Sequence, residues 1–164
     1  MKTCVFAGTF DPFTLGHEYV VNKCLEIFDK VIIAVGVNVT KRPFFTEEER
    51  VKIIKTAFDG NDKIEVVTYT GMLVDFMRDN GVKVTVRGIR NDEDYKYETT
   101  MAQYNQDMYS ECVTLYIPTP LSLAHVSSSA MRNIISLKGD ISAYVPQKSV
   151  DLINEIIEEK SKRL

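Results

Sequence analysis

Residues 8–17 read Gly-Thr-Phe-Asp-Pro-Phe-Thr-Leu-Gly-His, and they join the first strand pattern of the chain to its first helix pattern. Upstream, residues 3–7 form an apolar run of strand-forming residues that is too short for a helix. Downstream, apolar residues recur at helical spacing from position 20 to position 28. A turn between a parallel strand and a helix gathers anionic ligands, because free backbone N–H groups and the helix dipole point there. This stretch therefore predicts both an α/β fold and an anion site.

Several residues of this turn suit a phosphate. We expect Gly8 and Gly16 to let the backbone approach it closely, while Thr9, Thr14 and His17 add side-chain donors. The stretch has neither the G-x-x-x-x-G-K-[ST] pattern of a Walker loop nor the G-x-G-x-x-G pattern of a dinucleotide loop. A polar turn with an incidental histidine would explain any one of these residues, but their combination favours a functional site.

The rest of the chain alternates strand patterns with helix patterns. Further strands are predicted at residues 31–37, 64–68, 82–86 and 113–117, and further helices after Thr46, after Gly71, over about 94–108, from Ser127 and from Pro146. The last turns, residues 158–163, are predicted to be a solvated helix end. Alternation of this kind predicts an α/β fold with a doubly wound, five-stranded parallel sheet and helices on both faces. The polar motifs follow the first, second, fourth and fifth strands, so we expect them to meet at the carboxyl edge of the sheet.

Composition narrows the class of protein. A chain of 164 residues, 45% hydrophobic and 26% charged, fits one globular domain over residues 1–164 and excludes a disordered or fibrous class. The net charge of −3 predicts no nucleic-acid partner, and the absence of a long apolar run predicts no membrane segment. Cys4, Cys24 and Cys112 are odd in number and lack C-x-x-C spacing, which predicts a reduced cytoplasmic protein without a disulfide or zinc.

Four groups of residues are candidates for chemistry. His17 has no nucleophile motif and no ligand-spaced partner, so we expect it to donate a hydrogen bond or charge to a phosphate. Arg87 and Arg90 flank a glycine at a strand end and offer planar forks of donors for phosphate groups. Lys41-Arg42 on a loop would ordinarily be a solvated pair, and Ser127–Ser129 would ordinarily be an N-cap. Three consecutive serines also offer hydroxyls and free N–H groups, which suit a polyphosphate.

Four motifs, in matching order and spacing, resemble those of the nucleotidyltransferase superfamily, and within it the bacterial phosphopantetheine adenylyltransferases. They are G-T-F-D-P-F-T-L-G-H at 8–17, K-R-P-F-F-T-E-E-E-R at 41–50, R-G-I-R-N-D-E-D-Y-K-Y-E at 87–98 and V-S-S-S-A-M-R at 126–132. The resemblance covers essentially the whole chain. It implies a Rossmann-like fold that transfers the adenylyl group of ATP to 4′-phosphopantetheine, giving dephospho-coenzyme A and pyrophosphate.

The resemblance also assigns roles to positions of this sequence. It implies catalytic roles for His17, Lys41 and Arg90, and phosphopantetheine contacts at Thr9, Lys41, Leu73 and Arg87. It implies ATP contacts at Thr9, Phe10, His17, Gly88, Ile89, Arg90, Glu98, Leu123, Ala124, His125, Val126, Ser127, Ser128 and Ser129. It further implies use of Mg²⁺ without an assigned protein ligand, a homohexamer, and feedback inhibition by coenzyme A. Residues 123–125 replace a more aromatic stretch, so the contact to the adenine stays open.

The implied reaction needs no general base, because the attacking phosphate monoester has a second pKa of about 6 and is mostly ionised at neutral pH. A nicotinamide or nicotinate mononucleotide adenylyltransferase is the nearest alternative. A cytidylyltransferase acting on glycerol phosphate is disfavoured because the R-T-x-G-I-S-T-T signature is absent. A non-catalytic nucleotide-binding module is the alternative of another class, and it would bind ATP without releasing pyrophosphate.

Overall fold

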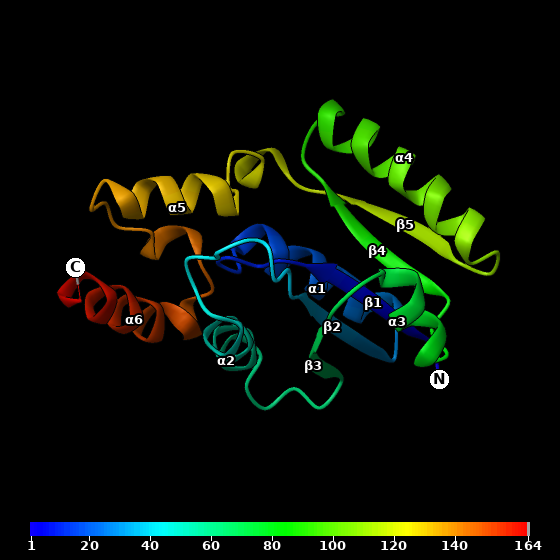
Figure 1. The fold of residues 1–164 in the computed structure, drawn as a ribbon, viewed down its shortest axis with the longest axis horizontal. Helices are drawn as coiled ribbons and strands as arrows, with labels where there is room; N and C mark the ends of the chain where they lie inside the picture. Colours follow the sequence, from blue (N-terminus) through cyan, green and yellow to red (C-terminus); the bar gives the residue numbers. More distant parts are fainter. Residues whose placement is uncertain (164) are drawn as a thin grey trace.

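Five parallel strands form the centre of the computed structural model, which describes residues 1–163 (Figure 1). Their bounds are β1 Thr3–Gly8, β2 Lys30–Gly36, β3 Ile64–Tyr69, β4 Val84–Ile89 and β5 Val113–Pro118. They pair in parallel in the order β3-β2-β1-β4-β5, which confirms the doubly wound sheet. The order reverses between β1 and β4, and an open α/β sheet binds its ligands at that switch point.

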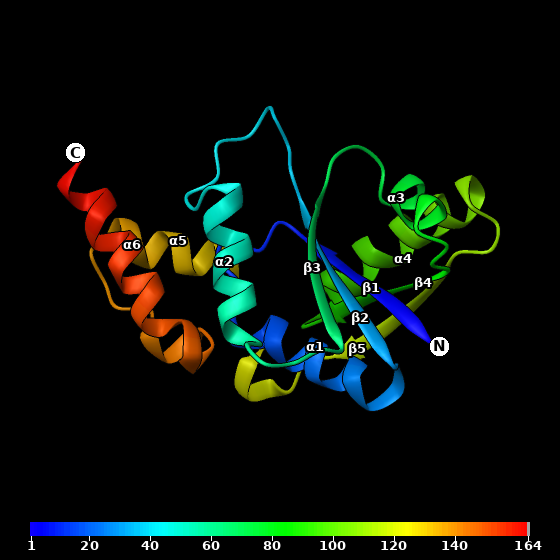
Figure 2. The same cartoon turned by 90° about the horizontal axis from the view of Figure 1, so that it is seen from below.

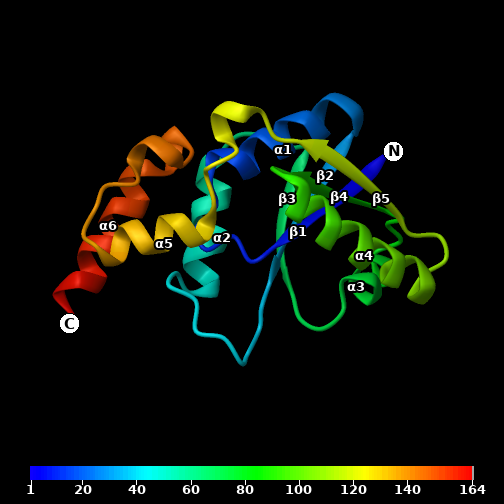
Figure 3. The same cartoon turned by 90° about the horizontal axis from the view of Figure 1, so that it is seen from above.

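Helices cover both faces of the sheet. They are α1 Leu15–Ile27, α2 Glu47–Ala57, α3 Leu73–Asp79, α4 Asp92–Met108, α5 Ser128–Ser136 and α6 Val150–Lys162. Short 3-10 turns occupy Leu121–Leu123, Ser142–Tyr144 and Gln147–Ser149. Figures 2 and 3 show α1 on one face and α3 and α4 on the other, with α5 and α6 beside α2 beyond the end of the strands.

The central strands are buried on both faces, as their continuous apolar runs predict. Because neighbouring side chains of a strand point to opposite faces, Cys4 and Phe6 join a large apolar cluster with α1, α2, α5 and α6. Val5 and Ala7 join a smaller cluster with α3 on the other face. This alternation fixes which face each helix covers.

Capping sets the start of two helices near the carboxyl edge. The Thr46 hydroxyl accepts from the Glu49 N–H, and the Glu49 carboxylate accepts from the Thr46 N–H, which starts the helix predicted after Thr46. A second box begins α1, where Thr14 is the N-cap and His17 occupies the third helical position. The histidine of the motif is therefore locked to the helix start.

Three elements have a boundary that differs from the predicted one by two residues or more. β4 extends to Ile89 because it pairs with β5 as far as Pro118, so Arg87 lies within the strand. Helix α4 begins at Asp92, after the Asn91 cap. The last helix begins at Val150 and not at Pro146, since a 3-10 turn intervenes and the buried Ser149 hydroxyl donates to the Ile53 carbonyl.

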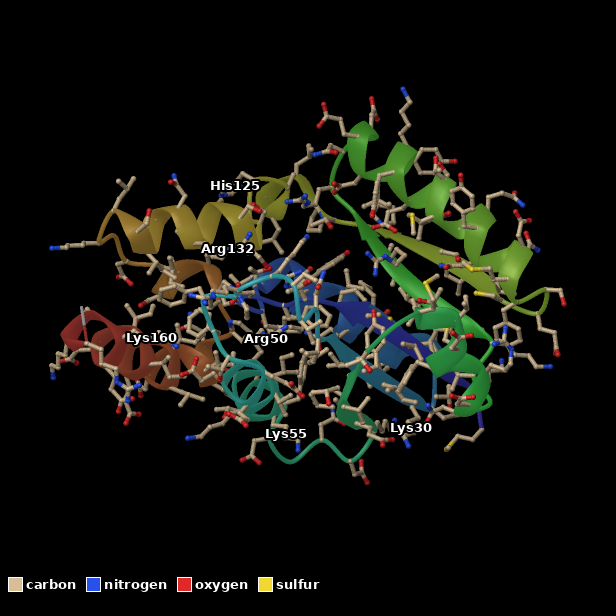
Figure 4. The ribbon with its side chains drawn as sticks, in the orientation of Figure 1. Lys30, Arg50, Lys55, His125, Arg132 and Lys160 are labelled. Carbon is tan, nitrogen blue, oxygen red and sulfur yellow. The ribbon has the colours of Figure 1, made fainter. Side chains whose placement is uncertain are left out.

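The end of α6 is exposed as predicted, except at the half-buried Lys160. Lys160 Nζ lies 2.9 Å from Glu49 Oε2 and 5.7 Å from the centre of the Phe44 ring, so it ties α6 to the start of α2 (Figure 4). No helix within residues 1–163 combines the length and the apolarity needed to cross a bilayer.

Candidate active site

A pocket of about 310 Å³ lies at the switch point between β1 and β4. Its walls come from the β1–α1 turn, the end of β4, the inner side of α4 and the start of α5. These segments lie far apart in the sequence and meet because all follow the carboxyl ends of parallel strands. The lining residues are Phe6, Ala7, Gly8, Thr9, Phe10, Thr14, Gly16, His17, Val20, Arg87, Gly88, Arg90, Asp94, Glu98, Thr119, Val126, Ser127, Ser128 and Ser129.

His17 is held in one orientation by its own helix cap. The Thr14 N–H donates to His17 Nδ1 over 3.0 Å, and the Thr14 hydroxyl lies 3.2 Å from the same nitrogen. Because a backbone N–H can only donate, Nδ1 is the unprotonated nitrogen and the ring proton of the neutral imidazole sits on Nε2. The site thus holds a single imidazole N–H donor in a fixed tautomer.

The surroundings of His17 also keep its imidazole neutral. Burial, followed by the positive charges of Arg90 and Arg87, lowers the pKa of His17 from 6.5 to about 3. The imidazole is therefore neutral at physiological pH. It can donate a hydrogen bond, but it does not add a positive charge, which removes the charged alternative left open by the sequence.

Aromatic rings support the imidazole. The Phe10 ring meets it edge-on at 5.0 Å between centroids, and the Phe13 ring lies at 5.3 Å. Phe10 has a φ of 54°, and a Cβ on Gly8 would approach its ring to 2.9 Å. Gly8 therefore leaves room for the Phe10 ring that packs against His17. The sequence predicted only that this glycine lets the backbone approach a phosphate.

Arg87 in β4 and Arg90 just after it are each paired to a carboxylate on α4. Arg87 donates from Nε and Nη2 to both oxygens of Glu98, at 2.9 and 2.8 Å, and from Nη1 to the Ala7 carbonyl. Arg90 donates from Nε and Nη2 to both oxygens of Asp94, at 2.9 and 3.1 Å. Both guanidinium groups are fixed at the pocket wall with N–H groups to spare.

The serine cluster caps α5 and keeps donors available. The Ser127 hydroxyl accepts from the Ala130 N–H, and the Ser128 hydroxyl donates to the Pro12 carbonyl. The Ser129 hydroxyl accepts from Arg132. Because the first N–H groups of a helix have no partner within it, the N–H groups of Ser128 and Ser129 stay available to an anion in the pocket.

A second, cationic pocket of about 240 Å³ adjoins the first, and Thr9 lines both. It is lined by Thr9, Asp11, Gly36, Asn38, Lys41, Arg42, Pro43, Arg50 and Arg132. Lys41 is exposed on the β2–α2 loop, and its ammonium makes no hydrogen bond to any residue within 1–163. A ligand charge in this pocket would meet that ammonium directly.

Sequence reasoning missed the roles of Asp11 and Arg50 in shaping this pocket, whereas it placed Arg132 at the same edge of the sheet. The buried Asp11 carboxylate accepts from the N–H groups of Phe44 and Phe45, and its main-chain carbonyl accepts from Arg132. The buried Arg50 donates from Nη1 to the carbonyls of Thr9 and Gly36, and Figure 4 shows Arg50 and Arg132 near the centre of the molecule. Asp11 lies in the first motif, but its partners are about 33 positions away, and no local pattern points to them.

Five predicted site residues lie outside both pocket linings. Leu73 packs with the smaller apolar cluster near the carboxyl edge. Ile89 is next to the lining residue Gly88, and Leu123 and Ala124 belong to the turn before Val126. His125 is exposed beside the start of α5 (Figure 4), and the centre of its ring lies 6.2 Å from that of Tyr144. The other predicted residues line one of the two pockets.

Known proteins share both the sequence and the fold. The cytidylyltransferase-like family model matches residues 5–134. A phosphopantetheine adenylyltransferase of Porphyromonas gingivalis is 43% identical over 143 residues, 87% of this chain and 93% of the relative. One of Cytophaga hutchinsonii is 37% identical over 147 residues, 90% of this chain and 98% of the relative.

Solved structures extend the comparison of folds. A putative nicotinate-nucleotide adenylyltransferase from Vibrio parahaemolyticus superimposes with a TM-score of 0.69 at 20% identity, covering 96% of this chain and 95% of that one. A bifunctional NMN adenylyltransferase/ADP ribose pyrophosphatase from Francisella tularensis gives 0.74 at 18% identity, covering 96% of this chain and 50% of that one. These likenesses concern the fold alone, whereas the sequence matches specify the group. The chain belongs to the phosphopantetheine adenylyltransferases of the cytidylyltransferase-like nucleotidyltransferase family.

Proposed function

We propose that this protein transfers the adenylyl group of ATP to 4′-phosphopantetheine, releasing pyrophosphate and forming dephospho-coenzyme A. One observation carries the proposal: a neutral imidazole donor, two fixed guanidinium groups and a helix start surround one pocket, and a free ammonium stands in the pocket beside it. In the two linings, the one hydroxyl placed against a base is that of Thr14 on His17 Nδ1, and it is buried in the cap of α1. Such a site suits a reaction whose barrier is the approach of two anions.

In the proposed reaction, a phosphate oxygen of phosphopantetheine attacks the α-phosphorus of ATP. The new P–O bond forms as the bond from that phosphorus to the α,β-bridging oxygen breaks, and pyrophosphate carries away the electron pair. The attacking phosphate is already ionised, so no proton has to be removed. The task of the protein is to position the two substrates and to stabilise charge.

Each polar group then has a role in that task. Lys41 and Arg87 hold the attacking phosphate, and Thr9, at the border of the two pockets, contacts both substrates. His17 Nε2 donates to the α-phosphate as charge develops there. Arg90 and the start of α5 receive the leaving pyrophosphate.

Mg²⁺ is proposed as part of the nucleotide substrate. The carboxylates that border the pockets are engaged, Asp94 and Glu98 by arginines and Asp11 by two N–H groups. Within residues 1–163 no three His, Cys, Asp or Glu side chains are placed to hold a metal. This donor set fits an ion that enters on the ATP phosphates and keeps its waters, where it neutralises phosphate charge.

An acceptor panel tests the proposed function. The protein is incubated with ATP and Mg²⁺, then with 4′-phosphopantetheine, nicotinamide mononucleotide, nicotinate mononucleotide or glycerol phosphate, and pyrophosphate is measured. Release with phosphopantetheine alone is expected. Release with a mononucleotide would support the alternative raised by the fold neighbours, and ATP binding without release would indicate a non-catalytic module.

Replacement of Lys41 by alanine tests the acceptor subsite. Because its ammonium has no protein partner, K41A should raise the KM for phosphopantetheine about tenfold through loss of one charge-assisted contact, with little change in the KM for ATP. The neighbouring R42A variant, which removes a charge from the same loop, is the comparison. Equal losses for both substrates in K41A would contradict the assignment.

A homohexamer is proposed from the family resemblance, with copies meeting through β5 and α4. Val113 and Leu115 are exposed on the edge strand, and no residue of the long helix α4 is buried in the single chain. Coenzyme A is proposed as a feedback inhibitor, because it contains the whole product and can fill both pockets. The proposed location is the cytoplasm, as the free, buried thiols suit reducing conditions.

Light scattering on the purified protein tests this assembly. The wild type should give the mass of six chains, and L115K should give smaller species because it places a charge in the edge contact. L137K, which alters an exposed leucine at the C-cap of α5, should keep the wild-type mass. A monomeric wild type, or equal dissociation by both variants, would contradict the proposed interface.

A further inference from the structure

Helix α4 presents two carboxylates to the pocket, one turn apart on its inner side. Asp94 reaches Arg90 and Glu98 reaches Arg87, and each contact is a two-oxygen fork on Nε and Nη2. The Asp94 carboxylate also accepts from the Arg90 backbone N–H over 3.0 Å. The side chains of Asp94 and Glu98 are 23% and 13% exposed, so both pairs are shielded from water more than ordinary surface pairs.

These contacts leave the phosphate-binding face of each arginine open. A guanidinium has five N–H groups, and Arg87 uses three of them, on Glu98 and on the Ala7 carbonyl. Arg90 uses two, on Asp94. In both residues, the Nε edge is held by the carboxylate while N–H groups on Nη1 and Nη2 remain for a ligand.

The ionisation state of Asp94 is consistent with its pairing to Arg90. Burial raises the pKa of Asp94, but hydrogen bonds from the Arg90 side chain and backbone, and the charges of Arg90 and Arg87, outweigh it and lower that pKa overall. The carboxylate thus stays ionised beside its arginine. An ionised carboxylate that faced the pocket directly would repel the phosphates of ATP. Here each carboxylate is paired with an arginine, whose positive charge offsets that repulsion.

We propose that Glu98 and Asp94 are positioning residues that serve different substrates, Glu98 aiming Arg87 at the phosphate of the acceptor and Asp94 aiming Arg90 at the phosphates of the nucleotide. The inference rests on the proposed function. It gives Glu98 a role through Arg87 in place of the direct ATP contact that the family resemblance implies.

Two conservative variants separate the role of Glu98 from that of Asp94. E98Q keeps the shape of the side chain but loses its charge, so it should raise the KM for phosphopantetheine about tenfold and leave the KM for ATP within about twofold. D94N should raise the KM for ATP about tenfold and leave the KM for phosphopantetheine within about twofold. E93Q, which neutralises an exposed carboxylate in the first turn of the same helix, should leave both values unchanged. Circular dichroism and thermal unfolding show whether each variant is folded.

A double-mutant cycle shows whether Glu98 acts through Arg87. E98Q added to R87K should cause less than about a twofold further change, because the fork that Glu98 holds is already lost. A raised KM for ATP in E98Q would overturn the inference and restore the direct ATP contact. A lowered KM for phosphopantetheine in E98Q would also overturn it, since the carboxylate would then compete with the substrate phosphate.

Calorimetric titration with MgATP keeps the inference separate from the proposed function. If the wild type does not turn over phosphopantetheine, the proposed function fails, yet D94N should still weaken ATP binding about tenfold while E98Q should not. If the wild type is active and both variants bind ATP equally, the inference fails and the proposed function stands.

Discussion

Replacement of His17 by alanine is expected to lower kcat by roughly a hundredfold or more, the usual effect of losing one donor that acts in the transition state. The structure gives the reason. The imidazole is neutral, its Nδ1 accepts from the Thr14 N–H, and its only N–H group, on Nε2, remains for the α-phosphate. Because that contact strengthens as charge develops, the KM for ATP should change little. Steady-state kinetics of pyrophosphate release measure both values.

His17 also caps α1, and two further variants separate that role from the chemistry. H17N places an amide oxygen where Nδ1 lies, so it keeps the cap and should lose activity as H17A does. H17Q places an amide N–H near Nε2, so it should retain more of the kcat than H17N. H17N as active as the wild type would remove Nε2 from the mechanism.

The pH profile gives an independent check on the ionisation state. Because burial and then the charges of Arg90 and Arg87 hold the pKa of His17 near 3, the neutral form persists as pH falls well below 6.5. The kcat should therefore show no step from histidine ionisation between about pH 5 and pH 8. A step near pH 6.5 that H17Q abolishes would show that the imidazole carries a charge in the active complex.

The sequence predicted the sheet and the position of the site because both depend on local patterns. A short apolar run rich in β-branched residues, such as residues 31–37, indicates a strand buried on both faces, and Thr46 with Glu49 three residues later indicates a helix start. Parallel strands then bring their following loops to one edge, which is why His17, Arg87 and Ser127–Ser129 converge as predicted.

Contacts between distant segments could not be predicted in this way. The pairing of Arg87 with Glu98 depends on how α4 lies across β4, and the contact of Lys160 with Glu49 depends on how α6 returns to α2. The buried Ser149 that delays the last helix bonds a carbonyl 96 positions away. In each case the local sequence fits a solvated surface equally well, and only the packing of other elements decides the outcome.

The contacts of Asp11 with Phe44 and Phe45 are also between distant segments and could not be predicted from local patterns. Replacement of Asp11 by alanine is expected to cause a larger loss of stability than any other substitution proposed above. Its side chain is 4% exposed, and its two oxygens accept from Phe44 and Phe45 over 2.8 and 2.7 Å. D11A would leave both N–H groups without partners, at about 1–3 kcal/mol each. We expect the free energy of unfolding to fall by about 3 kcal/mol or more, as measured by urea denaturation.

The same change should impair the acceptor subsite, because Phe44 and Phe45 end the loop that carries Lys41. Once the carboxylate no longer ties this loop to the β1–α1 turn, kcat/KM for phosphopantetheine should fall about tenfold or more beyond any loss for ATP. D11N keeps one oxygen for one N–H and should lie between the wild type and D11A.

Asp140 offers a matched control for Asp11, since its carboxylate also accepts two hydrogen bonds, from the N–H and the hydroxyl of Ser142, but on the surface. Water replaces those contacts, so D140A should cost no more than about 1 kcal/mol. Equal losses in D11A and D140A would mean that burial of the Asp11 carboxylate adds nothing. The loop that bears Lys41 would then owe its position to its own backbone, and the link from the first motif to the acceptor subsite would be broken.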